Sequence, residues 1–261
     1  MSKDGRIWLS HTGLENLERC PRCFWLQYNK GIRQPEGIVS RLANRFDVIL
    51  KNYFDSFRTT GELPPMVSGK LEGKLQNPFQ EKYFVRIDDE YGFLGKLDEC
   101  LINDSGEYIP VDFKTSSSDP REKETLSAYQ SQIDSYIYII AQNNMKVAGF
   151  GYLVYVYPDQ SPNLHNGFPM IIHVTKITGD PQNTVKRITN AMNVLESKIP
   201  LPAPECPFCN WYEKIKTEVG EKSDIKKIPT IELSKPLTHH PLINTSSPKK
   251  KIIENLQLDF S

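Results

Sequence analysis

The segment Gly95-Lys-Leu-Asp-Glu-Cys-Leu-Ile-Asn-Asp-Ser-Gly-Glu-Tyr-Ile-Pro-Val-Asp-Phe-Lys114 contains two apolar runs separated by the turn Asp104–Gly106. A turn sequence of this kind between two apolar runs predicts a β-hairpin. Because side chains alternate along a strand, Asp112 and Lys114 should lie on one face of the second strand. If the turn is centred on its middle residue, Asp98 lies opposite Asp112, with Cβ atoms roughly 5 Å apart.

The paired aspartates of this hairpin predict a metal site. Two carboxylates in opposite positions repel each other, so a sheet would not place them together for stability. A divalent cation between Asp98 and Asp112 would remove the repulsion, and Mg²⁺ prefers such hard oxygen ligands. Lys114 could then orient an attacking water and stabilise charge on a phosphate. The alternative is a hairpin whose charges face solvent, but the apolar run from Phe93 to Ile102 favours a buried strand.

The apolar patterns on either side of the hairpin predict a mixture of helices and strands. The longest helical patterns cover about 39–58, 122–144 and 181–197, and the strand patterns cover about 82–88, 92–102, 107–114, 148–157 and 170–177. We therefore expect an α/β fold in which a central mixed β-sheet is flanked by helices. A length of 261 residues fits one domain with appendages. Because periodic patterns end near Lys214, we expect one domain over 1–213 and a disordered tail over 214–261.

Four of the five cysteines form two Cys-x-x-Cys pairs, Cys20 with Cys23 and Cys206 with Cys209. In a reducing compartment such pairs are metal ligands more often than disulfides, and four sulfurs complete a site for Zn²⁺ or an iron–sulfur cluster. The long separation predicts a site that joins the two ends of the domain. Two unrelated pairs, or one redox pair, are the alternative. The remaining Cys100 lies in an apolar strand and is expected to be a core residue.

The overall charge and hydropathy exclude some classes of protein. The 32 Lys and Arg residues balance the 32 Asp and Glu residues, which argues against a generally basic DNA coat protein. No run of about 18 apolar residues is present, so no membrane span is expected. The charged segment Met1–Gly5 lacks the apolar stretch of a signal peptide, which predicts a cytoplasmic protein.

Taken together, these motifs resemble those of the PD-(D/E)XK nuclease superfamily, and in particular its RecB-like branch. The resemblance rests on three motifs, which are Gly95-Lys-Leu-Asp98, Asp112-Phe-Lys114, and Gln132-Ile-Asp-Ser-Tyr136 on a downstream helix. The resemblance covers about residues 8–212 and implies a restriction-endonuclease-like core. It also implies Mg²⁺- or Mn²⁺-dependent hydrolysis of DNA, by an exonuclease or an endonuclease.

The resemblance assigns roles to individual residues. It implies that Asp98 and Asp112 bind the catalytic metal, with the Phe113 backbone carbonyl as a further ligand, and that Lys114 positions the water. Gln132 and Tyr136 would hold the substrate strand or the lysine. Members of the family often carry a histidine ligand on the helix before the first strand. The corresponding helix here has no histidine, and Asp47 is the best substitute, with a helix-surface carboxylate as the alternative.

The cysteines are similar to those of the family's iron–sulfur branch, which includes AddAB-type and CRISPR-adaptation nucleases. There the cysteines flank the nuclease core and hold its two ends together, which implies a 4Fe–4S cluster. Better-known members place one cysteine before the core and three after it, whereas the split here is two and two. This departure keeps Zn²⁺ as an alternative.

The implied partners follow from this activity. DNA is the expected substrate, in repair, recombination or defence, and a helicase or recombination partner is a further expectation. The ending Gln257-Leu-Asp-Phe260 resembles the short peptides that bind the bacterial sliding clamp. The alternatives are a DNA-binding accessory protein with a nuclease-like fold and no turnover, and a zinc-dependent nucleic-acid-binding module.

Overall fold

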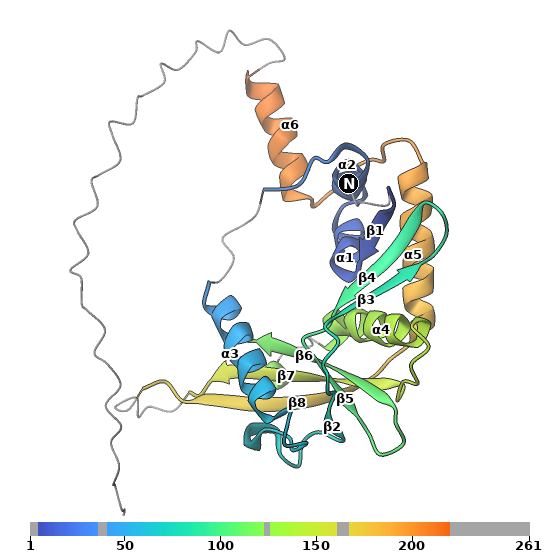
Figure 1. Ribbon diagram of the computed structural model, residues 1–261. Coiled ribbons are helices and arrows are strands. Elements are labelled where there is room, and N and C mark those ends of the chain that lie inside the picture. Colours follow the sequence, from blue (N-terminus) through green and yellow to red (C-terminus); the bar gives the residue numbers. More distant parts are fainter. Residues whose placement is uncertain (1–4, 36–40, 123–125, 161–166, 220–261) are drawn as a thin grey trace, which may run out of the picture. The chain divides into compact units, whose positions relative to one another are not determined.

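The computed structural model describes residues 5–35, 41–122, 126–160 and 167–219 of the chain. Contacts within the chain define one unit over Met1–Ile215 and a second over Lys216–Ser261. The fold is α/β, with central mixed sheets flanked by helices (Figure 1). Helix α6 (Pro207–Val219) continues past Lys214, and most of the expected tail, 220–261, lies outside the described residues.

A five-stranded sheet carries the predicted hairpin. Its strand order is β2 (Lys74–Leu75), β5 (Glu99–Ile102), β6 (Tyr108–Thr115), β7 (Phe150–Pro158) and β8 (Met170–Thr178). Strands β6 and β7 are parallel and the other neighbours are antiparallel. A parallel pair needs a crossover connection, and helix α4 (Leu126–Gln142) lies within it.

Helices cover both faces of this sheet. Along β7, Leu153 and Tyr155 belong to the core cluster that includes α4, whereas Tyr152 and Val154 belong to the cluster that includes helix α3 (Arg41–Phe57). This alternation shows that β7 is buried on both faces, as expected for a central strand with a parallel neighbour. On β6, Ile109, Val111 and Phe113 also pack in the α3 cluster.

A smaller three-stranded sheet lies beside the first, in the order β1 (Ile7–Ser10), β4 (Tyr91–Lys96) and β3 (Lys82–Arg86). It shares one hydrophobic core with helices α1 (His11–Arg19), α2 (Pro21–Lys30), α4 and α5 (Pro181–Glu196). The side chain of Ser10 caps α1 by accepting a hydrogen bond from Gly13 N, and Gly31 ends α2 in the left-handed region. Two short 3₁₀ turns, η1 (Pro65–Val67) and η2 (Pro120–Glu122), complete the described elements.

The prediction of one continuous strand over 92–102 was wrong. The chain leaves the smaller sheet after Lys96 and enters the larger sheet at Glu99, so β4 and β5 belong to different sheets. Leu97 is fully buried, and its backbone N–H donates to Glu81 O at 2.9 Å. The break places Asp98 immediately before β5, between the last residue of β4 and the first of β5.

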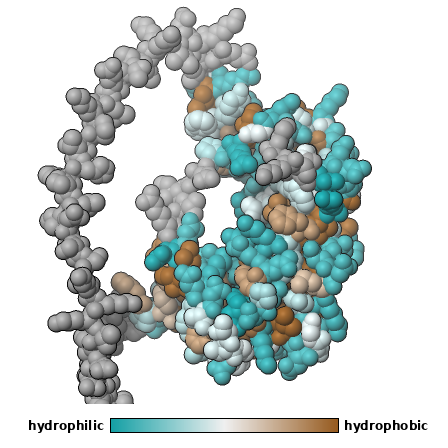
Figure 2. All heavy atoms as spheres, viewed as in Figure 1, coloured by the Kyte–Doolittle hydropathy of each residue, from teal (hydrophilic) through white to brown (hydrophobic). Residues whose placement is uncertain are grey.

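The visible surface in Figure 2 mixes hydrophilic and hydrophobic residues. No helix in the described parts of the chain is long and apolar enough to cross a membrane.

Candidate active site and four-cysteine site

The carboxylate of Asp112 is the buried centre of the candidate active site. Only 1% of the residue is exposed. Its Oδ1 atom accepts hydrogen bonds from Gln132 Nε2 at 2.7 Å and from the Tyr136 hydroxyl at 3.0 Å. Its Oδ2 atom lies 2.6 Å from Lys114 Nζ. Strand β6 and helix α4 therefore bring together four residues that the sequence predicted, since Gln132 and Tyr136 are one helical turn apart.

Gln132 connects the lysine to the aspartate. Lys114 Nζ donates to Gln132 Oε1 at 2.8 Å, while the amide nitrogen of the same side chain holds Asp112. The Lys114 ammonium also lies 4.6 Å from the centre of the Tyr129 ring. A single orientation of the Gln132 amide satisfies both neighbours, so this side chain bridges Lys114 and Asp112 in addition to their direct contact.

Burial changes the acidity of this cluster. Loss of solvent raises the pKa of Asp112 to about 6, and the nearby Asp98 charge adds to the rise while Lys114 opposes it. Burial also raises the pKa of Tyr136 well above its usual value, with the two aspartates contributing, so the phenol keeps its proton and donates. A buried carboxylate with a raised pKa is a common feature of functional sites.

Asp98 lies beside this cluster at the break between the sheets. The ladder pairs Glu99 with Val111, which is the register that the hairpin turn predicted and which places Asp98 next to Asp112. Asp98 Oδ2 accepts a hydrogen bond from the Phe113 backbone N–H at 3.0 Å. The ring of Phe113 lies on the α3 side of the sheet and packs against Phe54, with ring centres 4.8 Å apart.

Helix α3 contributes Lys51, which the sequence reasoning did not single out. Lys51 Nζ lies 2.8 Å from Asp98 Oδ1 and 2.9 Å from Asp47 Oδ2. Burial alone would lower the pKa of Lys51, but the two carboxylates outweigh that effect and raise it. The i,i+4 spacing of Asp47 and Lys51 is visible in the sequence, whereas the contact with Asp98 depends on how α3 packs.

The residues present fit a divalent cation. Asp112 Oδ2 is buried, forms an ion pair with the Lys114 ammonium at 2.6 Å, and makes no hydrogen bond to any residue in the described ranges. Asp98 and Asp112 together offer hard oxygen ligands from adjacent positions. A cavity of about 220 Å³ is lined by Gln132 and Tyr136, the two hydrogen-bond donors to Asp112, together with Ser10, His11 and Lys96, although neither aspartate lines it. The arrangement could accommodate a metal and part of a substrate.

Three other residues near the site make contacts outside the Asp112 network. Glu99, the next residue after Asp98, is buried and pairs with Arg58 at 2.6 Å. Its backbone neighbour Cys100 is fully buried in the core, as predicted. His11 begins α1, and its Nε2 atom lies 3.4 Å from Glu15.

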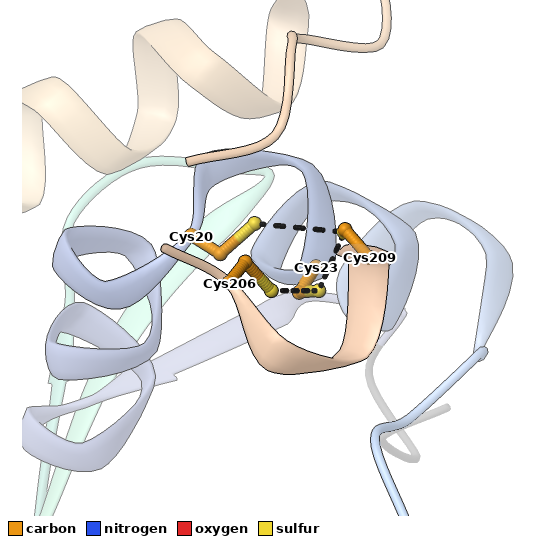
Figure 3. Close-up of side chains that lie close together, drawn as sticks. All are labelled: Cys20, Cys23, Cys206 and Cys209. Atoms are coloured by element: carbon orange, nitrogen blue, oxygen red, sulfur yellow. Dashed lines mark hydrogen bonds between the residues drawn. The ribbon is translucent and has the colours of Figure 1, made fainter. Parts of the chain in front are cut away.

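The four paired cysteines converge on one point (Figure 3). Cys20 and Cys23 lie at the start of α2, and Cys206 and Cys209 lie at the start of α6. The sulfur atoms are 3.9 Å apart for Cys20 and Cys209, 3.7 Å for Cys23 and Cys206, and 3.5 Å for Cys23 and Cys209. All four lie within 4.8 Å of one another, so they could hold a metal and join the two ends of the core.

The surroundings of Cys20 lower the pKa of its thiol, whereas those of Cys23 raise it. Burial tends to raise the pKa of Cys20, but hydrogen bonds from the backbone at Cys23 and Ala203 outweigh it and lower the pKa to about 7. Burial raises the pKa of Cys23 to about 11. Metal binding would require deprotonation of both thiols. An ion pair of 3.5 Å between Arg22 and Glu213 links α2 to α6 beside the sulfurs.

Comparison with known proteins finds solved structures that are similar at low sequence identity. No family model matches the chain. The crystal structure of SSO0001 is similar with 18% identity, a TM-score of 0.42, and coverage of 84% of this chain and 86% of that one. An alkaline exonuclease from Laribacter hongkongensis is similar with 12% identity, a TM-score of 0.39, and coverage of 82% and 94%. A phage-related exonuclease from Haemophilus somnus has 12% identity, a TM-score of 0.39, and coverage of 76% and 82%.

Proposed function

We propose that the protein is a Mg²⁺- or Mn²⁺-dependent nuclease that hydrolyses DNA phosphodiester bonds. The observation that carries the proposal is the network around Asp112, in which Lys114, Gln132 and Tyr136 all contact one buried carboxylate. A buried acid next to a second acid and an oriented lysine has little value for stability, since the desolvation of the charge opposes folding. The same set suits phosphoryl chemistry at a metal.

Each residue has a role in the proposed reaction. Asp98 and Asp112 would hold the metal, with the Phe113 carbonyl as a further ligand. When bound, the metal would polarise a phosphoryl oxygen and lower the pKa of its water. Lys114 would orient the attacking water and stabilise negative charge on the phosphate, because Gln132 holds its ammonium at 2.8 Å. Water then adds to phosphorus and one P–O ester bond breaks, which leaves a phosphate monoester and a hydroxyl end.

The experiment that tests this proposal compares Lys114→Ala with wild type on end-labelled single- and double-stranded DNA. We expect metal-dependent cleavage by the wild type and a loss of roughly 10²–10⁴-fold in the variant. Lys146→Ala is the matched control, because Lys146 makes an exposed 3.1 Å ion pair with Glu107 away from the site. Equal cleavage by Lys114→Ala and wild type would contradict the mechanism. The fragment pattern distinguishes an exonuclease from an endonuclease.

One observation favours a second candidate, a DNA-binding accessory protein with a nuclease-like fold and no turnover. The Lys51 ammonium lies 2.8 Å from Asp98 and already neutralises a proposed metal ligand. If that pairing were permanent, the site would hold no metal. Titration of the wild type with Mn²⁺ separates the two candidates, since only the nuclease requires binding at Asp98 and Asp112.

For the four-cysteine site, the sequence predicts a 4Fe–4S cluster with Zn²⁺ as the alternative, and the sulfur spacing supports Zn²⁺. A Zn–S distance of about 2.3 Å in a tetrahedron separates neighbouring sulfurs by about 3.8 Å. Three of the six sulfur separations, at 3.5–3.9 Å, are close to this value, and all six are within 4.8 Å. A cubic cluster would spread the sulfurs further apart, because each binds a different iron at a corner. Visible absorbance and metal analysis of anaerobically purified protein decide between the two.

The wider setting of the activity is also a proposal. DNA repair, recombination or defence would use such a nuclease, with a helicase or recombination factor as partner and the cytoplasm as location. The predicted clamp-binding peptide Gln257–Phe260 lies outside the described residues. Binding of a synthetic tail peptide to a sliding clamp tests that prediction separately.

A further inference from the structure

Lys51 occupies an unusual position for a helix-surface lysine. Its ammonium lies between two carboxylates, 2.8 Å from Asp98 and 2.9 Å from Asp47. The Lys51 side chain is 23% exposed and that of Asp98 is 18% exposed, so neither group is free in solvent. A partly buried ammonium that contacts two oxygens occupies the kind of position that a metal ion takes among carboxylates.

The proposed mechanism uses one lysine, Lys114, to orient the attacking water, and it gives Lys51 no role. Lys114 contacts Asp112 at 2.6 Å and is held by Gln132, whereas Lys51 contacts Asp98 on the side of α3. Each of the two adjacent aspartates therefore has its own ammonium. This pairing lowers the cost of placing two carboxylates side by side near the core, because each negative charge has an ammonium in contact with it.

A divalent cation and the Lys51 ammonium cannot both contact Asp98 Oδ1 at low cost. Mg²⁺ would lie about 2.1 Å from a carboxylate oxygen. An ammonium that stays on the same oxygen would then face two positive charges at close range, which is strongly unfavourable in a partly buried site. Asp47, one turn away and 40% exposed, offers the displaced ammonium a second partner within reach of its flexible stem.

We propose that Lys51 is an internal counter-ion that competes with the divalent metal for Asp98, and that Asp47 retains its ammonium when the metal is bound. Lys51 thereby sets the metal concentration at which the site fills. The inference rests on the proposed function in one respect, since it takes Asp98 as a metal ligand. Lys51 is a positioning residue in this scheme and does not touch the substrate.

The test is Mn²⁺ binding to the full-length protein without DNA, followed by the electron paramagnetic resonance signal of the free ion. Mn²⁺ is chosen because it prefers carboxylates to the thiolates of the cysteine site. In Lys51→Met we expect the Kd for Mn²⁺ to fall by roughly five- to a hundredfold relative to wild type. Lys51→Arg keeps the charge and should retain weak binding like that of the wild type.

Lys146→Met removes the same charge at a distant surface pair and should leave the Kd unchanged. A Kd in Lys51→Met that is unchanged or higher, or an equal fall in Lys146→Met, overturns the inference. If Lys51→Met does not fold, Lys51→Gln gives the same comparison. Cleavage of DNA reports separately on the proposed function. If Lys51→Met binds Mn²⁺ more tightly than wild type and the wild type does not cleave DNA, the inference is supported and the nuclease proposal is contradicted. If the wild type cleaves DNA and the two proteins bind Mn²⁺ equally, the nuclease proposal is supported and the inference is contradicted.

Discussion

Asp112 is the residue at which stability and the proposed chemistry conflict. Its carboxylate is 1% exposed, and burial raises its pKa from 3.8 to about 6. The folded state therefore holds a proton at Asp112 more strongly than the unfolded chain does. The stability associated with that proton is fully present below about pH 4 and is lost as the pH rises through about 6. At neutral pH without a metal, the ionised carboxylate destabilises the fold.

We expect Asp112→Asn to be more stable than wild type at pH 8 and equal to it near pH 4, in buffer without added Mg²⁺ or Mn²⁺. The amide resembles the neutral acid and does not ionise, and a shift of about 2 pKa units corresponds to roughly 3 kcal/mol. Urea unfolding at the two pH values measures the difference. A variant that is less stable at pH 8 would show that the Lys114 contact outweighs the cost of burial. Added Mn²⁺ should stabilise the wild type alone.

At the scale of elements, helix α4 lies very close to the sheet because glycine is present where it crosses β7. A Cβ atom at Gly151 would lie 2.9 Å from the Pro110 carbonyl oxygen and 3.0 Å from Ile133. The backbone oxygen cannot move without shifting β6, which carries Asp112 and Lys114. The close approach of α4 also keeps Gln132 and Tyr136 within hydrogen-bond distance of Asp112.

We therefore expect Gly151→Ala to lower the free energy of unfolding by about 1–3 kcal/mol and to reduce metal binding with it. Gly95→Ala is the matched comparison, because a Cβ there would meet only the flexible Ile139 side chain, at 3.2 Å. Its loss should be smaller, below about 1 kcal/mol. Thermal unfolding of both variants measures the contrast. Equal losses would mean that the backbone contact at Gly151 relaxes freely.

The hairpin shows which parts of the site could be predicted from sequence. The alternation along β6 and the turn register are local properties, so the shared face of Asp112 and Lys114 and the neighbouring position of Asp98 were predicted correctly. The break before Asp98 was missed, because it depends on the contact of Leu97 with a distant strand-end carbonyl. Lys51 was missed for the same reason, since packing of α3 against the sheet brings it to Asp98.

At the scale of the whole molecule, the four cysteines connect segments that lie far apart in the chain. Cys20 and Cys23 follow β1 and precede every other described strand, and Cys206 and Cys209 follow them all, so a shared metal would close a loop around most of the core. Closing a long loop restricts the unfolded chain and stabilises the folded one. The same pattern was predicted from the spacing of the pairs, and the convergence of the sulfurs agrees with it.

We expect Cys206→Ser to lose the metal and to lower the melting temperature by roughly 5–15 °C, since a loss of a few kcal/mol has that effect in a domain of this size. Metal analysis and thermal unfolding measure the two quantities. Cys100→Ala is the control, because Cys100 is a buried core residue outside the cluster, and it should keep the full metal content. Retention of one metal per chain by Cys206→Ser would contradict the four-sulfur site.

The position of the second cysteine pair also determines when the site can form during synthesis. Cys206 and Cys209 come after β8 and α5 in the chain, so a ribosome completes every described strand before it makes these ligands. The four-sulfur site can therefore form only after all these strands have been synthesised. A chain that is truncated before Cys206 would contain all the residues of the Asp112 network but could never be closed by the ion.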